Sequence, residues 1–91
     1  MTSKEKLYYL LTEYQKGKYD TNTFCDQFTF IYNTEADYNM LSEAENKLFS
    51  ELSIITARFS PYEEDLKLPN VYYSEQEVKF KVEEVVVKLL K

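Results

Sequence analysis

The chain has 91 residues, enough for one domain with a single modest core. Its 16 acidic and 11 basic residues give a net charge of −5, which argues against a protein that binds nucleic-acid phosphates through lysine and arginine. Because the sequence has no histidine and only one cysteine, it lacks the common nucleophile–base and zinc-binding arrangements, and we expect neither an enzyme nor a cofactor-binding protein.

The first helix is predicted over residues 3–16. Thr2 and Glu5 stand at the spacing of a capping box, and Gly17 follows where the C-terminus of a helix commonly has glycine. Between these ends, the apolar side chains recur on one side of a helix: Leu7, Leu10, Leu11 and Tyr14. We expect this side of the helix to pack against the core.

A second helix is predicted over residues 21–33, with Asp20 or Thr21 as its N-terminal cap. Its apolar stripe consists of Phe24, Phe28 and Ile31, with Tyr32 beside it. Cys25 lies at the edge of this stripe, and we expect its thiol to be buried and unreactive. The polar residues 33–39 then break the pattern, so we expect a loop there.

The longest helix is predicted over residues 42–59, starting at a second capping box formed by Ser42 and Glu45. Apolar side chains recur along it at steps of three and four: Leu41, Ala44, Leu48, Leu52, Ile55 and Phe59. Phe49 and Ile54 widen this face, which suggests that the helix contacts more than one neighbour.

This helix must end near Phe59, because Pro61 lacks a backbone N–H and biases Ser60 away from helical dihedral angles. We expect residues 60–73 to be irregular and to be held in place by apolar side chains: Tyr62, Leu66, Leu68, Val71 and Tyr72. Three consecutive acidic residues lie in this segment: Glu63, Glu64 and Asp65. Clustered carboxylates at a rigid helix end are suited to a cationic partner.

The last helix is predicted over residues 75–90, after a third capping box of Ser74 and Glu77. A strand is a physically allowed alternative because the segment is rich in valine, but no other segment offers it a partner strand. Four amphipathic helices with mostly short connections predict an all-α antiparallel four-helix bundle, formed as a single domain by residues 1–91. The expected core is Leu10, Leu11, Phe28, Leu48, Leu52, Ile55, Val82 and Val85, together with most of the nine tyrosines.

The charges are unevenly distributed along the chain. No basic residue occurs between Lys18 and Lys47, whereas six acidic residues do: Asp20, Asp26, Glu35, Asp37, Glu43 and Glu45. A stretch of one sign suggests a directional field, so this window is a second candidate surface, with Glu35, Asp37 and Glu43 as its expected contacts. The charged start of the chain lacks the apolar run of a signal peptide, and no stretch is long enough to span a bilayer. We therefore expect a cytoplasmic protein.

The segment after the third helix resembles a known family. Arg58, Phe59 and Pro61 precede the acidic residues, and Val71-Tyr72-Tyr73-Ser74 leads into a valine-rich final helix. This pattern is similar to that of the colicin D immunity family of bacterial self-protective proteins. The resemblance covers the second half of the chain by motif, and the first half only by length and number of helices. In that family the residue after the proline is acidic, whereas here it is Tyr62.

The resemblance implies an immunity protein that binds a cognate bacterial toxin nuclease, of the tRNA-cleaving kind, and occludes its basic cleft. Residues 63–65 would stand in for phosphates, and Tyr62, Tyr72 and Tyr73 would supply apolar anchors. Arg58 would orient the carboxylates from the helix C-terminus. Such a protein would have neither nucleic acid nor membrane as its partner and would be a monomer when free. The alternative is an acidic helical adaptor that binds a basic cytoplasmic partner other than a toxin.

Overall fold

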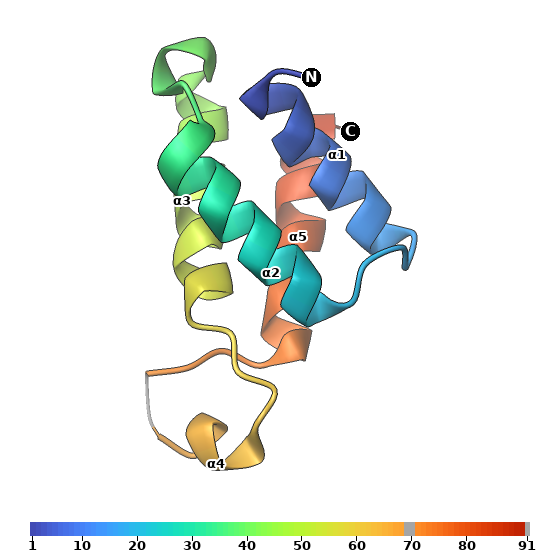
Figure 1. Cartoon of the computed structure of the whole chain (residues 1–91), viewed down its shortest axis with the longest axis vertical. Coiled ribbons are helices and arrows are strands. Elements are labelled where there is room, and N and C mark those ends of the chain that lie inside the picture. The colour runs from blue at the N-terminus through green and yellow to red at the C-terminus, as the bar shows by residue number, and fades with distance from the viewer. Residues whose placement is uncertain (69–70, 91) are drawn as a thin grey trace.

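The computed structural model describes residues 1–68 and 71–90, and within these ranges the regular structure is all helical (Figure 1). The four long helices are α1 (Ser3–Gln15), α2 (Thr21–Phe30), α3 (Glu43–Ala57) and α5 (Glu75–Leu90). A single turn, α4 (Glu63–Leu66), follows α3, and two short turns, η1 (Ile31–Glu35) and η2 (Tyr38–Met40), connect α2 to α3. The prediction of an all-α fold is confirmed, and the last segment is a helix rather than a strand.

The long helices begin and end at residues that satisfy the free backbone groups. Three capping boxes precede α1, α3 and α5: Thr2–Glu5, Ser42–Glu45 and Ser74–Glu77. The carboxylate of Asp20 accepts a hydrogen bond of 2.7 Å from the N–H of Thr23 and caps α2. Beyond α1, Gly17 has a φ of +79°, a conformation that residues with a Cβ rarely adopt, and its N–H donates to the Tyr14 carbonyl. The predicted caps are therefore confirmed.

The core lies where the apolar sides of the four long helices meet. α1 contacts α2 and α5, and α3 likewise contacts α2 and α5. The largest fully buried side chains come from all four helices: Leu7, Leu11, Phe24, Phe28, Phe49, Leu52, Val78, Val82 and Val85. Cys25 is also buried, and burial, followed by the nearby charge of Asp26, raises the pKa of its thiol to about 12. A thiol in this environment remains protonated and unreactive.

Some of the predicted core residues are less buried than their spacing indicates. Ile55 of the expected core is half-buried, and Ala44, which belongs to the predicted apolar stripe but not to the expected core, is exposed, because each lies beside a hollow between α3 and α5. The expectation that most tyrosines are buried is wrong, since of the nine only Tyr14 and Tyr32 are. The ring of the half-buried Tyr8 covers the core from outside, and its hydroxyl donates to the carboxylate of Glu45.

The connection between α2 and α3 also differs from the loop that we expected. After α2 the chain widens into a turn of π-helix, in which the N–H of Ala36 donates to the carbonyl of Ile31 at 2.9 Å. This turn keeps Ile31 and Tyr32 buried beyond the end of α2. The Tyr38 hydroxyl donates to the carbonyl of Tyr32 at 2.8 Å and anchors the following segment.

Replacing Leu52 with alanine should lower the free energy of unfolding by about 2–5 kcal/mol, because the fully buried side chain would leave a cavity. Denaturant unfolding followed by circular dichroism measures this change. The matched control is Leu68→Ala, which removes the same atoms from a side chain that is 51% exposed and should cost less than about 1 kcal/mol. If both variants lost the same free energy of unfolding, the placement of Leu52 in the core would be contradicted.

Candidate partner interface

The described residues of the segment from Arg58 to Tyr73 form a lobe, here called the α4 lobe, which projects from one end of the helices (Figure 1). Its two ends are joined where α3 stops. The N–H of Tyr73 donates to the carbonyl of Arg58 at 2.8 Å, and the N–H of Ser60 donates to the carbonyl of Tyr73 at 3.0 Å. These two bonds form an isolated bridge between Phe59 and Tyr73, and they hold the base of the lobe against the end of α3.

Within the α4 lobe, the Ser60 side chain organises the turn that follows Pro61. Ser60 is only 4% exposed, and its hydroxyl donates to the carboxylate of Asp65 at 2.7 Å. The same oxygen accepts a hydrogen bond of 3.2 Å from the N–H of Tyr62. We expected this segment to be irregular throughout. The structure differs, because these bonds place the three acidic residues on a single helical turn.

The three predicted acidic contacts differ in how accessible they are. Glu63 and Glu64 are exposed, whereas Asp65 is half-buried and bonded to Ser60. Arg58 makes no ion pair with any of them among the described residues, so the expectation that it orients the carboxylates receives no support. Two carboxylates, rather than three, are thus freely available to a partner.

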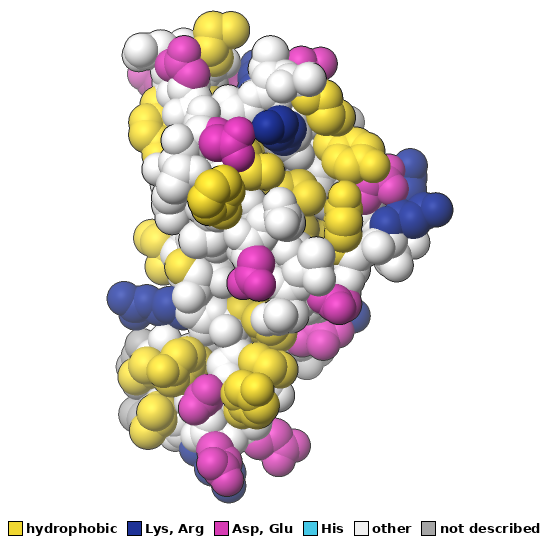
Figure 2. All heavy atoms as spheres, viewed as in Figure 1, with side chains coloured by type: hydrophobic (Ala, Val, Ile, Leu, Met, Phe, Trp, Pro, Cys, Tyr) yellow, Lys and Arg dark blue, Asp and Glu magenta, His cyan; other side chains and the backbone are white. Residues whose placement is uncertain are grey.

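Apolar side chains lie beside these carboxylates. The exposed ones on the described part of the lobe are Tyr62 (68% exposed), Leu68 (51%), Val71 (41%) and Tyr72 (39%). Figure 2 shows apolar and acidic side chains gathered together at this end of the molecule. Tyr73 is half-buried and its backbone forms the base of the lobe, so it is less accessible than the other two predicted tyrosine anchors. Exposed aromatic side chains next to charged ones are typical of protein-binding surfaces.

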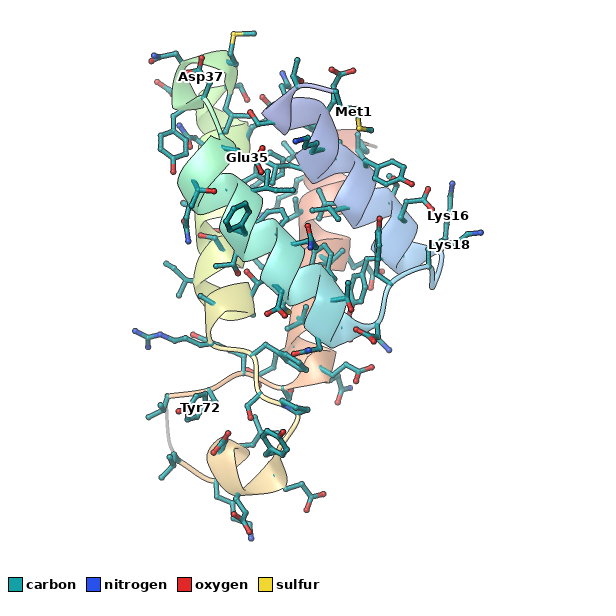
Figure 3. The ribbon with its side chains drawn as sticks, in the orientation of Figure 1. Met1, Lys16, Lys18, Glu35, Asp37 and Tyr72 are labelled. Carbon is teal, nitrogen blue, oxygen red and sulfur yellow. The ribbon has the colours of Figure 1, made fainter. Side chains whose placement is uncertain are left out.

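Two expected contacts of the second candidate surface, Glu35 and Asp37, lie at the opposite end of the molecule from Tyr72 of the α4 lobe (Figure 3). The acidic residues of this second surface are largely committed to local contacts. Glu35 pairs with Lys6 of α1 at 3.0 Å, and Asp37 accepts a hydrogen bond of 3.0 Å from the N–H of Asn39. Glu43 is exposed.

Glu45 belongs to the same window but is buried. Its carboxylate accepts hydrogen bonds from the Tyr8 hydroxyl and the Ser42 N–H, and it lies 3.2 Å from the ammonium of Lys4. Burial opposes ionisation of Glu45, but these three partners outweigh it and lower its pKa. For Tyr8, burial and the adjacent carboxylate both raise the pKa. The fold therefore brings lysines of α1 to a window that is purely acidic in the sequence.

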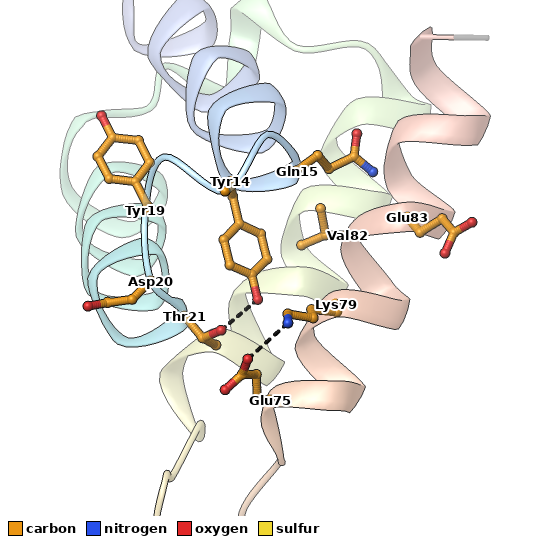
Figure 4. Close-up of a pocket in the computed structure, with 10 residues that line it drawn as sticks. Tyr14, Gln15, Tyr19, Asp20, Thr21, Glu75, Lys79, Val82 and Glu83 are labelled. Atoms are coloured by element: carbon orange, nitrogen blue, oxygen red, sulfur yellow. Dashed lines mark hydrogen bonds and ion pairs between the residues drawn. The ribbon is translucent and has the colours of Figure 1, made fainter.

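A hollow of about 750 Å³ lies between the end of α1 and the starts of α2 and α5 (Figure 4). Its polar groups are bonded to one another: the Tyr14 hydroxyl lies 2.7 Å from that of Thr21, and Lys79 pairs with Glu75 at 2.9 Å. In Figure 4 the Asp20 and Glu83 side chains point away from each other at opposite edges of the hollow. The polar groups that meet in the hollow are therefore already paired with one another.

A scan against protein-family models, a search of curated proteins and a search of solved structures each found no match to this chain. Within residues 1–68 and 71–90, no group of three or more histidine, cysteine, aspartate or glutamate side chains is placed to hold a metal ion. In the same ranges, none of the helices has the length and apolar character needed to cross a membrane. The resemblance to colicin D immunity proteins stays a prediction, and the surface of the α4 lobe carries the functional argument.

The buried Glu45 makes stability depend on pH. Because its pKa in the folded protein is below the ordinary value of 4.5, its ionic contacts stabilise the protein above that pH and are lost as the pH falls through the folded-state pKa. Glu45→Gln keeps a side chain that can complete the capping box, but it removes the charge. We expect the variant to be about 1–2 kcal/mol less stable than the original chain at pH 7, and we expect this difference to shrink as the pH is lowered from 7 to 3, as measured by urea unfolding. A stability difference that stays constant between pH 7 and pH 3 would contradict the lowered pKa of Glu45.

Replacing Ser60 with alanine should loosen the α4 lobe without unfolding the four long helices. Asp65 and the Tyr62 N–H would lose their partner, so the amides of Leu66, Lys67 and Leu68 should exchange with solvent about tenfold faster. Hydrogen exchange measured by NMR tests this, with the amide of Leu52 in the core as the internal control. Unchanged exchange in the lobe would mean that Ser60 does not organise it.

Proposed function

We propose that this protein is an immunity protein that binds a cognate bacterial toxin nuclease, of the tRNA-cleaving kind, and blocks its substrate cleft with the α4 lobe. The observation that supports this most is the composition of the lobe surface. Two exposed carboxylates, Glu63 and Glu64, stand beside the exposed rings of Tyr62 and Tyr72 on a backbone held by the bonds at its base. The motif of Arg58, Phe59 and Pro61 adds the resemblance described above.

The electrostatic part of the proposal follows from the substrate of such a toxin. A nuclease that cleaves RNA has a cleft lined by basic residues, and an acidic protein that enters this cleft competes with the RNA phosphates. The net charge of −5 would speed the encounter, because opposite charges raise association rates well above those of neutral partners. Rapid association matters when a toxin must be inhibited before it cleaves its substrate.

The apolar part of the proposal provides the affinity. Carboxylates at the edge of an interface mainly affect association and specificity, whereas a few buried aromatic side chains contribute most of the binding energy. Tyr62 and Tyr72 are the aromatic side chains that the α4 lobe exposes most, and each can bury its ring against the toxin while its hydroxyl stays hydrated. We assign them the role of anchors in the proposed complex.

We further infer that the four long helices form an antiparallel four-helix bundle, which acts as the rigid support of the lobe. The pairwise contacts support this, because each long helix packs against two of the others in a closed order: α1, α2, α3, α5 and back to α1. In this proposal the protein acts in the cytoplasm, where it would meet a toxin that reaches tRNA.

The first experiment is to co-express the protein with the nuclease domain encoded by the neighbouring gene, since an immunity gene should lie beside that of its toxin. Survival of the cells and formation of a complex between the two purified proteins are the expected results. If the neighbouring gene encodes no nuclease, or if the nuclease remains toxic and unbound, the immunity proposal fails. Binding to a basic protein that is not a toxin would favour the adaptor.

The second experiment removes charge from the lobe by the double change Glu63→Gln and Glu64→Gln, leaving Asp65 in place because it is bonded to Ser60. Association with the nuclease domain should slow by roughly tenfold at low salt and become less salt-sensitive, as measured by stopped-flow fluorescence. The matched control changes Glu75→Gln and Glu83→Gln, two exposed side chains of α5 that lie outside both the lobe and the acidic window, and it alters net charge equally.

The two candidate surfaces give opposite results in this assay. If the double variant and its control associate at equal rates, the lobe is not the contact surface. If neutralising Glu35, Asp37 and Glu43 instead abolishes protection of the cells, the interface lies at the other end of the molecule and the immunity function stands.

A further inference from the structure

The outer side of the α3–α5 pair exposes large apolar side chains. Phe80 of α5 is 74% exposed, and Val87, seven residues later and therefore on the same side of the helix, is 48% exposed. On α3, Ile54 is 55% exposed. Large apolar side chains exposed on an otherwise charged pair of helices are typical of a surface that another protein covers. We call it the α3–α5 face.

The α3–α5 face is hollowed at two places. A hollow of about 380 Å³ lies beside Phe80 and includes Ile55 and Tyr73 in its wall. A second hollow, of about 300 Å³, lies farther along the same two helices, beside Ala44 and Lys88. The first is the more apolar of the two, because its wall carries two aromatic rings and an isoleucine, and it is large enough to receive an aromatic side chain.

The charged residues around the two hollows are balanced, unlike those of the chain as a whole. They are three lysines and three glutamates: Lys47, Lys81, Lys88, Glu51, Glu77 and Glu84. Lys81 pairs with Glu51 at 2.7 Å and with Glu84 at 3.1 Å, and Lys88 pairs with Glu84 at 2.8 Å. The net charge of −5 therefore resides on the rest of the molecule.

We propose that a second copy of this chain binds to the α3–α5 face and forms a symmetric dimer. Two copies that meet through other, acidic parts of the surface repel each other, whereas this face carries as many lysines as glutamates and adds no net repulsion between copies. A two-fold axis places the same patch on both sides of the contact. The Phe80 ring of each copy then enters the apolar hollow of the other, and the two pairs of helices pack against each other.

This inference is independent of the proposed immunity function, and it replaces the expectation of a free monomer. The exposed side chains assigned to toxin binding, Tyr62, Glu63, Glu64 and Tyr72, are not part of the walls of either hollow. The test therefore needs no toxin, and its result leaves the immunity proposal unaffected.

The experiment is sedimentation velocity of the purified chain over a range of concentrations. The monomer has a mass of 10.9 kDa, and we expect the average mass to approach twice this value as the concentration rises toward about 1 mM. Phe80→Glu should raise the dimer dissociation constant by at least about 30-fold, because it removes a buried aromatic contact and inserts a charge. Circular dichroism establishes that each variant is folded.

The matched control is Phe30→Glu, which makes the same change at a phenylalanine of α2 that is 58% exposed. It should dimerise like the original chain. The proposal is overturned if the original chain remains a monomer throughout the range, or if Phe80→Glu and Phe30→Glu dimerise equally well. If both changes disrupt the dimer to the same extent, the α3–α5 face is likewise not its specific interface.

Discussion

The ring of Phe49 on α3 determines how the first half of the chain packs. It meets the rings of Tyr8, Phe28 and Tyr32 edge-on, with centroid distances of 5.5, 5.9 and 6.5 Å, so one fully buried side chain touches α1, α2 and η1. Edge-to-face contacts of this kind favour particular ring orientations and do not only bury area. The contact with Tyr8 also directs its hydroxyl to Glu45, so the packing of the core and the buried ionic contacts depend on each other.

The helices could be predicted from the sequence because their determinants are local. A capping box spans four residues and an apolar stripe repeats every three or four, so Ser42 and the residues up to Leu52 already contain the information for most of α3. The end of this helix could also be predicted, because Pro61 acts on the residues directly before it. Burial beyond the stripe was harder to predict. Phe49 and Ile54 were both expected to widen the apolar face of α3, but only Phe49 is buried, whereas Ile54 is 55% exposed.

The remaining features depend on contacts between residues that are distant in the sequence. The bridge between Phe59 and Tyr73 joins backbone groups, which carry no side-chain pattern, so the closed base of the α4 lobe could not be predicted. The pairing of Lys6 with Glu35 requires α1 and η1 to be adjacent, so the sequence alone shows an acidic window without the lysine that partly neutralises it. For the candidate site, the residue types of the lobe were predictable, whereas the inward position of Asp65 was not.

The closed base of the α4 lobe has a consequence for how such a protein can evolve. The chain leaves α3 and returns toward α5 at adjacent points, so what lies between Ser60 and Tyr73 can change in length or composition while the helices keep their packing. Substitutions that alter the exposed residues of the lobe act on surface with little burial and cost the core little stability. This segment could therefore be exchanged as a cassette, with the packing of the four long helices unchanged.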